Sequence, residues 1–137
     1  MKALTISSIW AFNILCGNKT IEWRTWQTHY RGPILICSSA KRTKNSIPGH
    51  ALLICTLKDI VPFTEEHLSG AMMDQVPSPA GFAWILDDFV PIYPQPVKGR
   101  LKLFDLDIKP EPLPSDITDD ELKAIYCPLY IFPGQRQ

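Results

Sequence analysis

The chain lacks the sequence marks of several large protein classes. Its four cysteines match no zinc-ligand spacing and include no Cys-x-x-Cys pair, and its three histidines are far apart with no other ligand at metal spacing. No glycine-rich phosphate loop is present, and no Ser-His-Asp arrangement supports a nucleophilic triad. These absences argue against zinc-dependent, P-loop and serine-hydrolase functions, and we expect no metal and no other cofactor.

Long apolar runs are also missing. None approaches the roughly 20 residues that a helix needs to span a bilayer. The N-terminus shows no signal-peptide pattern, because Asn13 and Asn18 interrupt any apolar region there. We therefore expect a cytoplasmic protein with no membrane partner, while the sequence leaves its oligomeric state open.

The composition that is present is that of an ordinary globular domain. Of 137 residues, 45% are hydrophobic and 20% are charged, which suits a single domain with a buried core. Cys37 and Cys55 lie within apolar runs, so we expect them to be buried thiols.

Charge is unevenly distributed along the chain. Residues 1–60 hold eight Lys and Arg against two acidic residues, and residues 61–137 hold six against twelve, so the two halves carry +6 and −6. Such asymmetry favours a polyanion partner for the basic half. The alternative is that folding interleaves the two halves and their fields cancel.

Alternating apolar and polar residues predict a mainly β fold. Strands are expected over residues 2–7, 20–25, 34–38, 51–61, 82–89 and 101–106. Short helices are expected between Ser7 and Gly17, over residues 64–73, and from Thr118 to Tyr126, where Glu121 completes a capping box. Five or six strands and two or three short helices around one core predict a small, partly closed β-barrel of the α+β class.

One stretch combines this alternation with charge. In the expected strand 20–25, Glu22 and Arg24 fall on one face, while Ile21 and Trp23 fall on the other. Lys19 lies just before the strand. The pattern predicts a polar site on one face and a packed face with Trp23 on the other. We expect Trp10, on the first helix, to belong to the core as well.

These residues resemble the ASCH domain, a PUA-like β-barrel. The resemblance covers about residues 2–106 and rests on Leu4-Thr5-Ile6-Ser7 with Trp10, Gly17-x-Lys19-x-x-Glu22-x-Arg24, Trp26 with Tyr30-Arg31-Gly32-Pro33, Ser38-Ser39-Ala40-Lys41, Ala83-Trp84-Ile85-Leu86 and Pro96-Val97-Lys98-Gly99. It implies a PUA-like barrel over residues 1–107. The Pro-rich extension 108–137, with one short helix, would pack on the same domain.

The resemblance also implies a function connected with RNA. In this family a cleft beside the barrel is proposed to bind RNA. Some bacterial members resemble hydrolases that remove an acyl group from N4-acetylcytidine, and ribonuclease activity has been proposed for others. We therefore expect RNA, or a nucleoside or nucleotide, as the partner.

Three ionisable residues are the candidates for chemistry. Lys19 can bind phosphate, or act as a base if desolvation lowers its pKa. Glu22 can receive a proton or a base amino group, and Arg24 can offer a planar fork to a carboxylate or phosphate. In an enzyme, Lys19 and Glu22 would be catalytic; the alternative is that Glu22 and Arg24 form a structural ion pair.

Other residues are candidates for holding a ligand. Trp26 and Tyr30 offer flat faces for stacking, worth roughly 1–3 kcal/mol per base. Arg31 can contact phosphate or merely anchor its turn, and Ser38 can polarise a substrate carbonyl. The basic loop 41–44 can follow a phosphate backbone. The expected ligand-binding set is Arg24, Trp26, Tyr30, Arg31, Ser38 and Lys41.

Three functions therefore stay open. The first is binding of RNA or a modified nucleoside in a basic, aromatic-lined cleft beside the barrel. The second is an enzyme, either an amidohydrolase acting on N4-acylated cytidine or a ribonuclease. The third is a protein-interaction or accessory module that uses the acidic second half and the Pro-rich tail as its contact surface.

Overall fold

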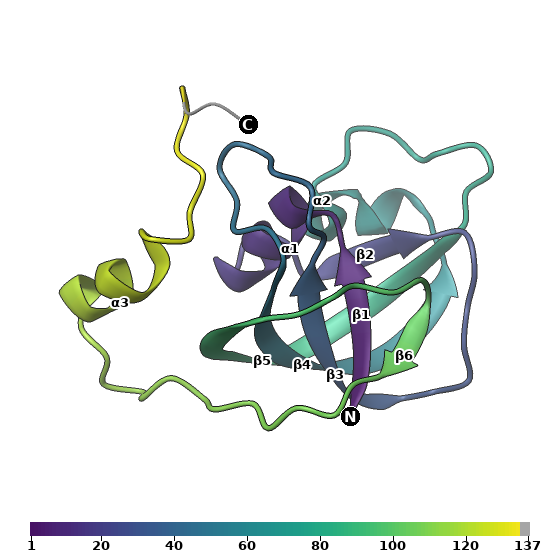
Figure 1. Cartoon of the computed structure of the whole chain (residues 1–137). Coiled ribbons are helices and arrows are strands. Elements are labelled where there is room, and N and C mark those ends of the chain that lie inside the picture. Colours follow the sequence, from purple (N-terminus) through teal and green to yellow (C-terminus); the bar gives the residue numbers. More distant parts are fainter. Residues whose placement is uncertain (135–137) are drawn as a thin grey trace.

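In the computed structural model, which describes residues 1–134, six strands form one sheet that curls into a half-barrel (Figure 1). Residues 135–137, the end of the expected extension, lie outside the described part. The strand order is β2-β5-β4-β3-β1-β6, with β1 and β3 parallel and all other neighbours antiparallel. The strands are β1 (Lys2–Ile6), β2 (Ile21–Arg24), β3 (Gly32–Ser38), β4 (His50–Pro62), β5 (Phe82–Pro96) and β6 (Leu103–Asp105).

Short helices accompany the sheet, as the predicted small α+β PUA-like fold requires. They are α1 (Ser8–Leu15), the 3-10 turn η1 (Glu65–His67), α2 (Leu68–Ala71) and α3 (Asp119–Tyr126). The capping box predicted for α3 is present, since the Thr118 hydroxyl accepts from the Glu121 N–H. The single helix expected over residues 64–73 is instead η1 followed by α2.

Strand β5 is longer than the sequence indicated. We expected it to end near Phe89, ahead of three prolines, but it runs to Pro96. Beyond residue 85, β5 pairs with β4 but no longer with β2, and its other edge carries an isolated bridge, between Ile92 and Pro112. Prolines, which have no N–H to donate, are tolerated along such a sparsely paired edge. Register shifts along the β4–β5 pair add twist and help to curl the sheet.

The main core lies between the sheet and α1. Ala11 and Ile14 of α1 are buried against apolar side chains of β1, β3 and β4. Gly17, with a φ of +84°, ends the helix as predicted. Cys37 and Cys55 are buried thiols, as expected, and burial raises the pKa of each to about 12.

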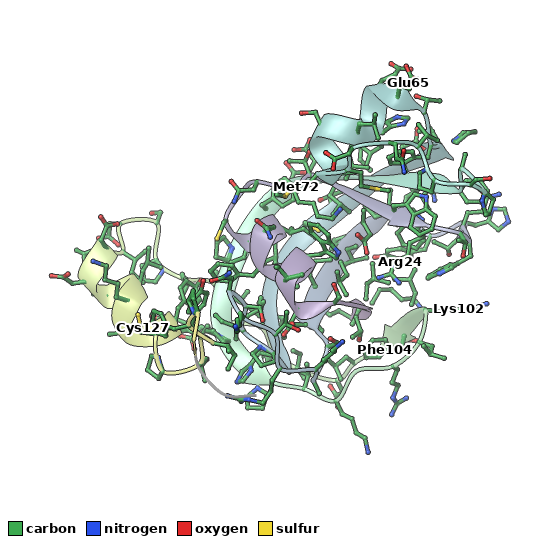
Figure 2. The ribbon with its side chains drawn as sticks, turned by 90° about the horizontal axis from the view of Figure 1, so that it is seen from above. Arg24, Glu65, Met72, Lys102, Phe104 and Cys127 are labelled. Carbon is green, nitrogen blue, oxygen red and sulfur yellow. The ribbon has the colours of Figure 1, made fainter. Side chains whose placement is uncertain are left out.

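The half-barrel stays open between β2 and the β1–β6 pair, which form the two ends of the sheet. Side chains rather than a strand ladder bridge this gap. The Arg24 Nη2 of β2 donates to the Thr5 carbonyl of β1 at 3.0 Å, and the Lys102 ammonium lies 5.8 Å from the Trp26 ring centroid. Figure 2 shows Arg24 and Lys102 on the same side of the molecule, opposite Cys127 near α3.

The segment after β6 runs along the edge of the sheet to α3 and then towards the loop between β3 and β4 (Figure 1). Tyr93 of β5 donates its N–H to the Glu111 carbonyl. Further on, Ile131 pairs with Ser46, and the Tyr130 hydroxyl donates to Asn45 at 3.2 Å. The tail is therefore tied both to β5 and to the loop that carries the basic residues 41–44.

Gly81, just before β5, fixes the position of β2. Its φ is +65°, and a Cβ there would lie 2.7 Å from the Arg24 carbonyl oxygen and 2.8 Å from Trp23 Nε1. We expect Gly81→Ala to lower the free energy of unfolding by about 2–4 kcal/mol, because the cost of a left-handed backbone adds to a steric clash. Urea unfolding followed by tryptophan fluorescence measures this.

The matched control is Gly17→Ala. Gly17 also has a positive φ, but a Cβ there would meet nothing within 4 Å. Its cost should stay at about 1–2 kcal/mol, the backbone contribution alone. Equal losses in the two variants would mean that the close approach at Gly81 contributes nothing.

Candidate functional site

A pocket of about 300 Å³ opens beside the gap in the half-barrel. The end of β1 forms one wall, β2 forms another, and α1 and the region of α2 complete it. It is lined by Ile6, Ser7, Trp10, Lys19, Glu22, Trp23, Arg24, Ala71 and Met73. We call this the triad pocket, after Lys19, Glu22 and Arg24, which the structure brings together.

Three charged groups form a connected cluster in this pocket. The Glu22 carboxylate lies between the two cations, 3.6 Å from Lys19 Nζ and 3.0 Å from Arg24 Nη2. The side chains of Lys19 and Glu22 are only 3% and 8% exposed, and that of Arg24 is 22% exposed. With two cations and one anion, the cluster leaves a net positive charge in a largely water-excluded site.

Backbone oxygens hold both cations in place. Lys19 Nζ donates to the Ala71 carbonyl at 2.8 Å, across 52 residues of sequence, and Arg24 donates to Thr5. Strand alternation explains why Glu22 lies beside Arg24: the two residues are two positions apart and so share one face of β2. The structural ion pair considered from the sequence is therefore present, and it lies inside a pocket.

Burial lowers the pKa of the Lys19 ammonium below its ordinary value. The Glu22 carboxylate opposes this effect through its charge and a hydrogen bond, while the Arg24 guanidinium adds to it. Desolvation is the largest of these causes. The amine consequently loses its proton more readily than an exposed lysine, as a general base requires.

Two tryptophan rings border the cluster. Trp10 is 37% exposed, and its ring centroid lies 5.2 Å from Lys19 Nζ. The expectation that Trp10 belongs to the core was wrong. Trp10 shares a face of α1 with the buried Ile14, but Trp10 lies one turn earlier, where α1 borders the pocket. Trp23 packs on a small apolar cluster, as its place in the alternation indicated, yet it lines the pocket as well.

The aromatic residues that the sequence favoured as stacking surfaces lie elsewhere. Trp26 and Tyr30 pack against the main core, and neither lines the triad pocket. Trp26 meets Trp84 edge to face at 4.8 Å, and the Tyr30 hydroxyl donates to the Pro33 carbonyl. Both rings already have packing partners within the fold.

The other three candidate ligand residues also lie outside the triad pocket. Arg31 donates to two carbonyls of its own turn and lies 3.6 Å from Asp59, an arrangement that anchors the turn. The Ser38 hydroxyl is buried and bonded to the His50 backbone. Lys41 is exposed, and its carbonyl accepts from Ser8 at the start of α1.

Metal ligands and membrane-spanning helices are both missing from residues 1–134. That part of the chain contains no group of three or more His, Cys, Asp or Glu side chains placed to hold a metal ion. It also contains no helix whose length and apolar character would let it cross a bilayer.

Comparison with known proteins points to one family. The family model for the ASCH domain matches residues 4–97. A solved serine-to-alanine mutant of ASCH from Zymomonas mobilis has a TM-score of 0.57 at 17% identity, over 77% of this chain and 87% of that chain. A second solved structure of ASCH from the same organism has a TM-score of 0.53 at 18% identity, over 92% of this chain and 78% of that chain. At these identities the likeness concerns the fold alone. No curated protein matches the chain.

Proposed function

The chain belongs to the ASCH domain family, and we propose that its triad pocket binds one nucleobase, either of RNA or of a modified nucleoside. The observation that carries this proposal is the buried Lys19–Glu22–Arg24 cluster in a pocket bordered by tryptophan rings. A volume of about 300 Å³ is at the small end of ligand sites, as a single base would require.

The chemistry of the cluster matches the edge of a pyrimidine base. Such an edge presents both amino donors and carbonyl or ring-nitrogen acceptors, which proteins read by hydrogen bonding once the base is unstacked. Glu22 accepts from an amino group, and Lys19 or Arg24 donates to a carbonyl oxygen. The exposed face of Trp10 supplies a stacking surface beside them.

Binding of N4-acetylcytidine by isothermal titration calorimetry tests this proposal through Trp10. We expect Trp10→Ala to weaken binding by about 5- to 100-fold, because base stacking on an aromatic ring is worth roughly 1–3 kcal/mol. Trp10→Phe keeps a flat ring and should keep most of the affinity. Val90→Ala, which changes an exposed apolar residue of β5, is the control for truncation away from the pocket.

Two results would contradict base binding in this pocket. One is that the wild-type protein binds no nucleoside at millimolar concentration. The other is that Trp10→Ala binds as tightly as the wild type.

A second candidate function is hydrolysis of the N4-acyl group, and one observation favours it. The Lys19 amine has a lowered pKa and lies 3.6 Å from the Glu22 carboxylate. In this reaction neutral Lys19 takes a proton from the water that attacks the acyl carbon. The resulting Lys19 ammonium passes that proton to the Glu22 carboxylate, and Glu22 delivers it to the departing N4 amine. The amide C–N bond breaks, and the products are cytidine and acetate.

A further inference from the structure

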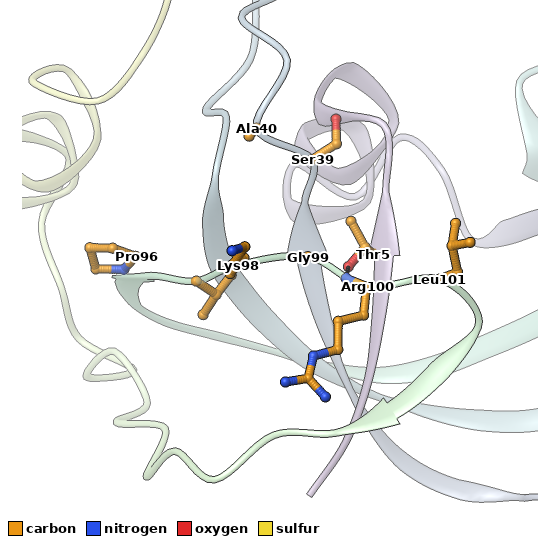
Figure 3. Close-up of a pocket in the computed structure, with 9 residues that line it drawn as sticks. Thr5, Ser39, Ala40, Pro96, Lys98, Gly99, Arg100 and Leu101 are labelled. Carbon is orange, nitrogen blue, oxygen red and sulfur yellow. Dashed lines mark hydrogen bonds between the residues drawn. The ribbon is translucent and has the colours of Figure 1, made fainter.

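A second pocket, of about 620 Å³, lies on the other side of the end of β1. It is lined by Thr5, Ser39, Ala40 and the segment 96–101, which links β5 to β6. Figure 3 shows this segment crossing beside β1, with Ser39 and Ala40 above it. We call it the crossing pocket.

The frame of the crossing pocket is fixed by backbone contacts. Ser39 N–H donates to the Ile6 carbonyl, Gly49 N–H to Ser39, and Val97 N–H to Gly49, at 2.8 to 3.1 Å. At Gly99 the segment passes so close to β1 that a Cβ would lie 2.8 Å from Thr5 Cγ2. The pocket is therefore part of the folded sheet and not a chance gap between loops.

The two pockets are neighbours across β1. Thr5 lines the crossing pocket, and the next two residues, Ile6 and Ser7, line the triad pocket. The Arg24 guanidinium, part of the triad, donates to the Thr5 carbonyl. Since a strand rises about 3.3 Å per residue, the two sites are separated by only a few ångströms of backbone.

The lining of the crossing pocket combines apolar surface with positive charge. Pro96, Val97 and Leu101 contribute apolar surface, and Leu101 is 92% exposed, far more than any other large apolar side chain in residues 1–134. Lys98 and Arg100 are the charged residues of the lining, and neither forms an ion pair with any described residue. No acidic residue lines the pocket within the described chain.

Both halves of the sequence contribute to the lining of the crossing pocket. Ala40, at one wall, leads directly into the basic loop 41–44, which the Ser8 hydroxyl anchors through the Lys41 carbonyl. Lys98 and Arg100, at the opposite wall, come from the half of the sequence with net negative charge. An exposed apolar surface edged by unpaired cations suits a nucleotide, whose base or sugar is apolar on its face and whose phosphate is an anion.

We propose that the crossing pocket holds the nucleotide next to the one in the triad pocket, so that the ligand is a single-stranded RNA and not a free nucleoside. This inference rests on the proposed function of the triad pocket. The apolar surface of Pro96, Val97 and Leu101 takes the neighbouring sugar or base, and Lys98 and Arg100 contact phosphates of the strand. Figure 3 shows the Arg100 side chain extending to the side of the segment opposite Ser39.

The test compares two ligands with matched protein variants. The ligands are free N4-acetylcytidine and a fluorescein-labelled single-stranded RNA of five nucleotides with N4-acetylcytidine at its centre. The variants are Lys98→Ala with Arg100→Ala, and, as a control of equal charge, Lys109→Ala with Lys123→Ala on the tail. Affinities are measured by calorimetry and by fluorescence anisotropy over a range of salt concentrations.

We expect the wild type to bind the RNA more tightly than the nucleoside. The Lys98/Arg100 variant should bind the RNA roughly tenfold more weakly, and the slope of log affinity against log salt should become shallower by about 0.7 for each phosphate that the variant no longer neutralises. Its affinity for the nucleoside should not change. The Lys109/Lys123 control should bind both ligands like the wild type.

Several outcomes would overturn the inference. If the RNA binds no more tightly than the nucleoside, or the Lys98/Arg100 variant keeps the full RNA affinity, the crossing pocket is not an RNA subsite, although the triad pocket keeps its proposed role. Polyglutamate serves as a third ligand, and if the Lys98/Arg100 variant loses affinity for polyglutamate as much as for RNA, the pocket is a general anion site that suits an acidic protein segment. If the wild type binds neither ligand, the proposed function itself is wrong.

Discussion

Replacing Glu22 with alanine will lower the free energy of unfolding by about 3–5 kcal/mol, because it leaves two buried cations facing each other without their shared anion. Lys19 and Glu22 are almost fully buried, and Arg24 is mostly buried, so solvent screens this loss poorly. In thermal unfolding followed by circular dichroism, the midpoint should fall by roughly 10–20 °C.

Two comparisons isolate the cause of this loss. Asp105→Ala breaks the exposed pair with Lys2, in which the aspartate side chain is 76% exposed, and should cost less than about 1 kcal/mol. In a Lys19→Met background, Glu22→Ala should lower the free energy of unfolding by at least about 1 kcal/mol less than it does in the wild type. The reason is that only one buried cation, Arg24, then loses its anionic partner. A cost that is the same in both backgrounds would show that the cluster is not energetically coupled.

The local part of the site could be predicted from the sequence. Strand alternation alone places Glu22 and Arg24 on one face, and the glycine that ends α1 places Lys19 close to the start of the strand. These relations depend on residues within a few positions of one another. The same is true of the Thr118 capping box and of the apolar runs that became β3 and β4.

The contacts between distant segments could not be predicted in this way. Lys19 donates a hydrogen bond to the carbonyl of Ala71, and no sequence pattern near either residue indicates that contact. The roles of the aromatic residues could not be assigned for another reason. Core packing and base stacking use the same side chains, so the residue type does not distinguish them. Trp26 packs against the core and Trp10 borders the pocket, because tertiary packing and not the local pattern decides which ring is covered.

The distribution of charge illustrates the same limit. The basic and acidic halves of the sequence are not separate halves of the molecule, because Lys2 pairs with Asp105 and Lys58 with Asp87. The prediction of a polyanion partner from the basic half alone is therefore too simple. The two cations that line the crossing pocket, Lys98 and Arg100, come from the half of the sequence with net negative charge.

Replacing Lys19 with methionine will separate a catalytic lysine from one that only binds. If the protein hydrolyses N4-acetylcytidine, Lys19→Met should reduce cytidine release by about 100- to 10,000-fold, the usual contribution of a positioned general base. Methionine keeps most of the length and the apolar stem of the side chain, so the pocket stays filled. Chromatography of the reaction mixture measures the release, and Lys58→Met, which changes a mostly exposed lysine of β4, is the control.

The pH dependence of the hydrolysis rate is a further test of Lys19 as the general base. Burial lowers the pKa of the Lys19 ammonium below its ordinary value, so the hydrolysis rate should rise with pH as the amine becomes neutral and should level off at a lower pH than an exposed lysine would give. Lys19 has a lower pKa in the folded protein than in the unfolded protein. Between these two pKa values the unfolded protein binds more protons than the folded protein. The free energy of unfolding should therefore also rise with pH across that interval, and Lys19→Met should remove that rise. A rate that does not change with pH, or equal cytidine release by Lys19→Met, would exclude the amine as the base and leave the triad pocket as a binding site.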